Sequence, residues 1–138
     1  MKPYEIALNQ YGVKGIPGAQ DNPVIEQYFK DIGAGFVTDD DTAWCACFMN
    51  WCLLKAGKPS SSLLNARQFL TYGMPTDTPQ LGDIVVLWRI SPTSNYGHVA
   101  FYVSKNLDGT INLLGGNQDN QVEIKAFSTN QVLAYRRI

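Results

Sequence analysis

The chain has 138 residues, of which 45% are hydrophobic and 17% charged, and this size predicts one domain, residues 1–138, with a single core. Its net charge of −1 argues against a nucleic-acid-binding or membrane-surface protein. The absence of any apolar run of about eighteen residues argues against a membrane span, and residues 1–5 do not begin a Sec signal peptide. We therefore expect synthesis in the cytoplasm, and action outside the cell would require a phage lysis system, a specialised secretion machine or a larger precursor.

The first half of the chain carries apolar residues at helical spacing. Asn22 and Pro23 form an N-cap followed by a proline at the first helical position. The acidic run at 39–42 offers N-cap residues for the next helix, and Gly57 marks its end. The predicted helices cover residues 4–11, 25–32, 43–56 and 64–70.

After Asp83, which we interpret as a turn residue, the pattern changes to short apolar runs typical of strands. Residues 107–110, with an Asp-Gly pair, predict a hairpin turn. Helices followed by an antiparallel sheet of about five strands indicate an α+β domain. The predicted strands cover residues 84–88, 99–103, 111–114, 122–124 and 132–135.

Three cysteines lie in the third predicted helix, which we expect to be amphipathic. Cys45 falls in its first turn, where unpaired N–H groups and the helix dipole favour a thiolate. Cys47 points about 200° away, and Cys52 lies well inside the helix, so both are expected to be small core residues. A metal site is disfavoured, because Cys45 and Cys47 have no second pair of ligands. Cys45 is the candidate nucleophile.

The single histidine, His98, precedes an apolar strand and is the natural proton acceptor for a thiol. Gly97 before it allows a substrate or another backbone segment to approach closely. The side chains of Trp44, Tyr96 and Trp88 are candidates for the walls of a substrate groove, although such aromatic residues belong to cores equally often. Trp44, Tyr96 and Gly97 are therefore the predicted substrate-binding residues.

An imidazole needs a third group that fixes its orientation. Asn117 follows the strand that the predicted hairpin pairs with the histidine strand, so its amide oxygen is the candidate acceptor. The alternative is that Asn117 serves only a Gly-Gly-Asn turn in a left-handed conformation, and Gln118 or Asp119 would then take its place. The predicted catalytic residues are Cys45, His98 and Asn117.

Several segments in this order resemble the NlpC/P60 and CHAP superfamily of papain-like cysteine peptidases and amidases, most closely a small single-domain CHAP-like branch of bacteria and phages. The chain has Trp-Cys-Ala-Cys at the nucleophile, where the common NlpC/P60 pattern is Asp-Cys-Ser-Gly. The matching segments are Thr-Ala-Trp-Cys-Ala at 42–46, Leu-Gly-Asp-Ile-Val-Val at 81–86, Gly-His-Val-Ala-Phe-Tyr at 97–102 and Leu-Gly-Gly-Asn-Gln at 114–118.

The resemblance implies a papain-like core and cleavage of an amide bond in the peptide stems of bacterial peptidoglycan, as in an endolysin or a secreted antibacterial effector. We therefore expect the protein to act on the cell wall or periplasm after phage-type release or specialised secretion. A secreted effector would be inhibited by an immunity protein. The mechanism is acyl transfer through a thioester, and it requires no metal or organic cofactor. The alternatives are a non-catalytic wall-binding domain, or an acyltransferase or deamidase on the same core.

Overall fold

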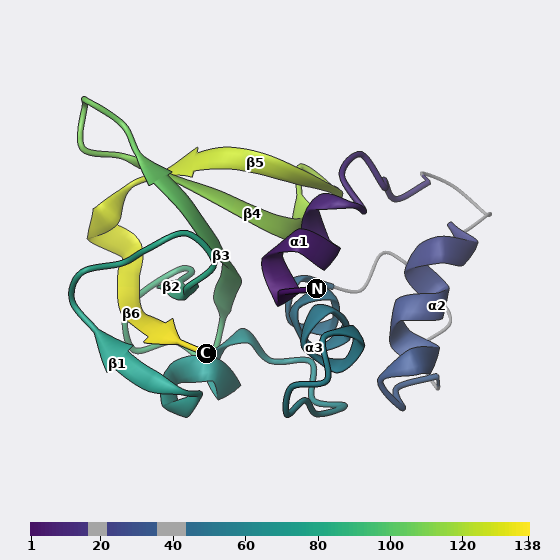
Figure 1. The fold of residues 1–138 in the computed structure, drawn as a ribbon. Coiled ribbons are helices and arrows are strands. Elements are labelled where there is room, and N and C mark those ends of the chain that lie inside the picture. The colour runs from purple at the N-terminus through teal and green to yellow at the C-terminus, as the bar shows by residue number, and fades with distance from the viewer. Residues whose placement is uncertain (17–21, 36–43) are drawn as a thin grey trace.

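The computed structural model describes residues 1–16, 22–35 and 44–138, and Figure 1 shows their arrangement. The acidic run at 39–42, predicted to cap the third helix, lies outside these residues. The described helices are α1 (Pro3–Leu8), α2 (Pro23–Asp31) and α3 (Cys45–Lys55), with two 3-10 helices, η1 (Ala66–Thr71) and η2 (Thr129–Gln131). None of them is long and apolar enough to cross a membrane.

The helix boundaries follow the local signals of the sequence. The Asn22 side chain accepts a hydrogen bond of 2.8 Å from the Val24 N–H, and Pro23 is the first residue of α2, as predicted. Gly57 follows α3 with a positive φ of 74°, which ends the helix. The predicted fourth helix is the 3-10 helix η1.

The strands of the described residues form one six-stranded antiparallel sheet in the order β1-β6-β2-β3-β4-β5. About five strands were expected. The additional strand, β1, is a three-residue segment containing a proline, and it is defined only by its pairing with β6. The strands are β1 (Met74–Thr76), β2 (Ile84–Trp88), β3 (Gly97–Lys105), β4 (Ile111–Gln118), β5 (Gln121–Phe127) and β6 (Val132–Arg137).

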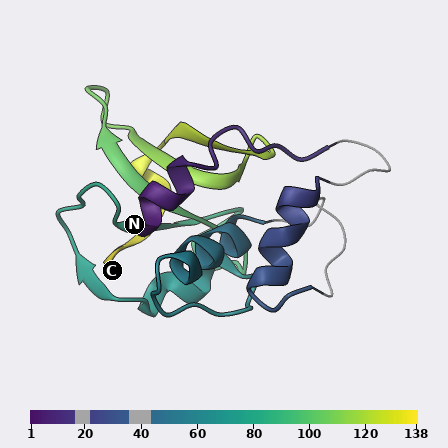
Figure 2. The same ribbon diagram turned by 45° about the vertical axis from the view of Figure 1, so that its right-hand side comes forward.

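Helix α3 is the centre of the fold and is not amphipathic, contrary to the prediction. It contacts α1 and α2 as well as β3 and β4, so nearly its whole circumference is covered. Both views show it between α2 and the strands (Figure 1, Figure 2). Because its first residue is Cys45, this packing sets the position of the candidate nucleophile relative to the sheet.

The sheet is buried on both faces. Val99 and Phe101 of β3 pack into the main core with the helices, whereas Ala100 and Tyr102 belong to a second apolar cluster on the opposite face. His98 is two residues before Ala100 and shares its face. Leu87, which lies opposite His98 in the β2–β3 register, also belongs to this second cluster.

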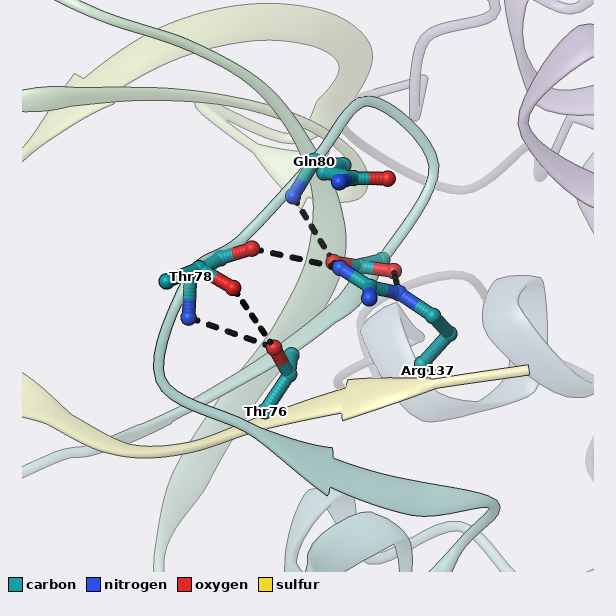
Figure 3. Close-up of polar contacts among 5 residues, drawn as sticks. Thr76, Thr78, Gln80 and Arg137 are labelled. Atoms are coloured by element: carbon teal, nitrogen blue, oxygen red, sulfur yellow. Dashed lines mark hydrogen bonds and ion pairs between the residues drawn. The ribbon is translucent and has the colours of Figure 1, made fainter.

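Asp83 stabilises the turn before β2, as predicted, and also forms an ion pair. Its carboxylate accepts a hydrogen bond of 2.7 Å from the Gln80 N–H and lies 2.8 Å from a guanidinium nitrogen of Arg137 in β6. Figure 3 shows Arg137 directed at the loop of Thr78 and Gln80. This buried carboxylate thus ties the start of β2 to the end of the chain.

Candidate active site

Cys45 is the first residue of α3, and Trp44 occupies the N-cap position. The Trp44 carbonyl accepts a hydrogen bond from the Phe48 N–H, and the Trp44 side chain makes no capping hydrogen bond. The N–H groups of the first helical turn have no hydrogen-bond partner within the helix itself. They leave positive potential beside the Cys45 thiol.

His98 lies near the start of β3, opposite Leu87 of β2 in the antiparallel register. The side chain is buried, and its ring stacks on Phe127 with a centroid separation of 5.3 Å and an interplanar angle of 22°. Two strands and an aromatic ring thus hold the imidazole in one orientation.

The structure brings Cys45 and His98 together. Burial alone would raise the pKa of the Cys45 thiol, but the adjacent imidazole and backbone hydrogen bonds at Val99 and Ala46 lower the pKa below its ordinary value. Burial favours the neutral ring of His98, yet its charge interaction and hydrogen bond with Cys45 raise its pKa. The opposite shifts are those of a thiolate–imidazolium pair.

Gln118 is the residue whose side chain forms a hydrogen bond with Nε2 of the imidazole. Its Oε1 lies 2.9 Å from His98 Nε2, and its amide nitrogen donates to the carbonyls of Leu113, at 3.0 Å, and Glu123, at 2.8 Å. Both carbonyls can only accept, so the amide NH₂ must face them and Oε1 must face the ring. Nε2 is then the protonated nitrogen, which leaves Nδ1 for the thiol.

Asn117, the predicted third residue, is partly exposed and has a left-handed backbone with φ 57°. This conformation matches the alternative considered for it. Strand β4 continues through the predicted Gly-Gly turn to Gln118, with an irregular register after Gly115. A Cβ atom at Gly115 would lie 2.7 Å from Gln118 Oε1, so this glycine leaves room for the amide that reaches His98.

A groove of about 340 Å³ opens beside His98. It is lined by residues from β2, β4, β5 and the segments next to them, including Trp88, one of the aromatic candidates. Arg89, Lys125 and Phe127 also line it, although no sequence motif marks them. Pairing the strands would have indicated Arg89, because it directly follows the strand opposite Gly97 and His98.

The predicted substrate-binding residues lie elsewhere. Trp44 is fully buried, packs edge-on against Phe48 and donates to Asn120 at 3.3 Å, so it is a core residue in this structure. Tyr96 is 64% exposed but does not line the groove. At Gly97 the structure shows the second predicted alternative, the close approach of another backbone segment: a Cβ atom there would lie 2.9 Å from the Leu87 carbonyl oxygen.

The other two cysteines are fully buried. Burial raises the thiol pKa of Cys47, and the nearby Cys45 raises it further by a smaller amount. Burial also raises the thiol pKa of Cys52. Across residues 1–16, 22–35 and 44–138, no three or more His, Cys, Asp or Glu side chains cluster as metal ligands do. Of the three cysteines, Cys45 is the one whose thiol pKa is lowered.

The CHAP domain family matches residues 37–117, which is more than half of the chain and includes Cys45, His98 and Asn117. A comparison with curated proteins finds no match. A cysteine-bearing helix packed on an antiparallel sheet is the papain-like arrangement of this family. The chain belongs to the CHAP family, within the NlpC/P60–CHAP superfamily of peptidoglycan-hydrolysing domains.

Proposed function

We propose that this protein is a cysteine hydrolase that cleaves an amide bond in the peptide part of peptidoglycan. Cys45 is the nucleophile, His98 is the general base and acid, and Gln118 orients the ring in the role first predicted for Asn117. The observation that carries the proposal is the coupling of the Cys45 thiol to a buried imidazole beside a groove. CHAP membership supplies the substrate class.

The arrangement supports acyl transfer in two stages. The Cys45 thiolate attacks the carbonyl carbon, and the oxyanion that forms is stabilised by N–H groups at the start of α3. The C–N bond then breaks as the His98 imidazolium gives its Nδ1 proton to the leaving amine. A water molecule attacks the thioester and loses a proton to Nδ1. The carboxylic acid leaves, and the thiolate–imidazolium pair is restored.

The contact between Gln118 and His98 defines what the third residue contributes. Because both amide protons of Gln118 are held by carbonyls, its Oε1 stabilises the ring tautomer with a proton on Nε2. The same bond stabilises the imidazolium formed when the thiol ionises. Gln118 therefore acts on the reaction through His98.

The test is digestion of purified peptidoglycan by the wild type and by Cys45→Ala, with the products identified by mass spectrometry. We expect fragments from the wild type alone, at a rate at least ~1,000-fold above that of the variant, because no other group supplies the nucleophile. The masses of the new termini identify the bond that is cut.

Cys47→Ala is the matched control, since it removes a thiol from the same helix and should retain hydrolysis. Equal activity of Cys45→Ala and the wild type would disprove the assignment. No fragments from folded wild type would instead support a wall-binding domain.

A further inference from the structure

An unpaired cation lies in the groove beside the imidazole. Arg89 directly follows β2, lines the groove and is exposed. Within the described part of the chain, its guanidinium has no ion-pair or hydrogen-bond partner. It is close enough to His98 for its charge to oppose protonation of the ring.

The backbone that carries Arg89 is fixed on both sides of the residue. Its N–H donates to the Tyr96 carbonyl at 3.3 Å, and its carbonyl accepts from the Ser91 N–H at 2.8 Å and from the Ser94 hydroxyl. These hydrogen bonds connect the two sides of the loop that joins β2 to β3, close to the paired ends of the strands. The backbone position from which the Arg89 side chain extends is therefore fixed relative to His98.

Arg67 in η1 holds the remainder of the same loop. Its guanidinium donates to the carbonyls of Tyr96 and Pro92, both at 3.0 Å, and to that of Ser91 at 3.2 Å. Ile90 keeps a φ of 70° and is 79% exposed, a strained conformation for a β-branched residue that gains nothing from burial. The loop is therefore a preorganised support for Arg89.

The other charges of the groove largely cancel. The Lys125 ammonium lies 2.9 Å from the Asp119 carboxylate, and both residues line the groove. Arg89 is left as the uncompensated charge, and a guanidinium presents its N–H groups in a fork that matches a carboxylate. A ligand with a free carboxylate would provide the missing partner.

We propose that Arg89 is a specificity-determining residue that binds a carboxylate of the substrate's peptide stem in the groove beside His98. The protein then prefers stems with free carboxyl groups to stems in which these groups are amidated. The inference rests on the proposed function for the identity of the substrate. Binding of the stem itself can be measured without hydrolysis.

The experiment measures binding to the Cys45→Ala variant by calorimetry. The probes are a lysine-type stem tetrapeptide with free carboxyl groups and the same peptide with every carboxyl group converted to a carboxamide. We expect about tenfold tighter binding of the free acid, as for one charge-assisted hydrogen-bonded pair. Adding Arg89→Gln should reduce the ratio to about one, and Arg89→Lys should retain part of it.

Lys105→Gln in the same background is the matched control, because it removes one positive charge from the exposed end of β3. It should keep the tenfold preference. Equal binding of both peptides, no binding of either, or an unchanged preference in Arg89→Gln would overturn the inference. Peptidoglycan digestion by the wild type is scored separately. Preferential binding without digestion would refute the proposed hydrolase and retain the role of Arg89.

Discussion

The first residue of helix α3 and the positions further along it place cysteine side chains in opposite electrostatic environments. Cys45 at its first residue has a lowered thiol pKa, whereas Cys47 and Cys52 further along have raised ones. All three residues are buried, and burial opposes ionisation at each of them. The difference comes from the surroundings of Cys45: His98, backbone hydrogen bonds and the start of the helix.

This comparison shows that cysteine burial alone does not indicate an inert core residue. A thiol two residues away on the same helix faces a different part of the fold and lacks the imidazole. The reactivity of a cysteine in α3 therefore depends on whether the sheet places His98 beside it. This dependence can be tested through the alkylation rates of the three thiols, the contact of α3 with β4 and the hydrogen bond between His98 and Gln118.

The largest expected effect is on thiol reactivity. With iodoacetamide at pH 6, Cys45 should be alkylated at least ~100-fold faster than Cys47 and Cys52, because only the thiolate reacts. Peptide mapping by mass spectrometry after timed quenching measures the three rates. His98→Ala should slow Cys45 by about tenfold or more, because loss of the imidazole raises the thiol pKa. Equal alkylation rates for all three cysteines in the folded protein would contradict the inferred difference between Cys45 and the other two.

The next effect is on the contact that holds the start of α3 against β4. A Cβ atom at Gly116 would lie 2.7 Å from the Trp44 ring and 2.8 Å from Phe48 Cβ. We expect Gly116→Ala to lower the free energy of unfolding by about 1–3 kcal/mol, and to reduce peptidoglycan hydrolysis as Cys45 shifts from His98. Urea denaturation and digestion rates measure the two effects.

Gly109→Ala is the control for this change. Gly109 lies in the turn between β3 and β4 with φ 91°, and no atom lies within 4 Å of an added Cβ. The strained backbone lowers stability there too, but hydrolysis by the folded protein should be unchanged. Loss of activity in both variants would mean that stability, rather than the position of α3, explains the result.

The smallest expected effect is on the pH profile of hydrolysis. Activity requires an ionised Cys45 and a protonated His98, so it rises through the lowered thiol pKa and falls through the raised imidazole pKa. The Gln118 hydrogen bond helps to raise the pKa of His98. Gln118→Ala should therefore move the alkaline limb of kcat/KM to lower pH, by less than about one unit.

Asn117→Ala provides the matched comparison at the neighbouring position. In the structure the ring contact belongs to Gln118, so this variant should leave the alkaline limb in place. A shift with Asn117→Ala and none with Gln118→Ala would return the third role to Asn117.

Much of the fold could be predicted from the residues alone. The cap at Asn22, the stop at Gly57 and the turn at Asp83 depend on local backbone chemistry, and each is confirmed. Strand β1 and the continuation of β4 through its glycines could not be predicted. Strand β1 exists through its pairing with β6, and the glycines of β4 make room for α3 and Gln118.

The sequence by itself determined the α+β class, the papain-like family and the expectation that a thiol at a helix start would meet the only histidine. These features follow from periodicity, local backbone signals and ordered motifs, which are properties of the chain. Only the tertiary structure decided that Gln118 reaches the ring, that Trp44 is core and that Arg89 lies in the groove. Strand register and the close approach of α3 to β4 set those contacts, and both depend on residues far apart in the sequence.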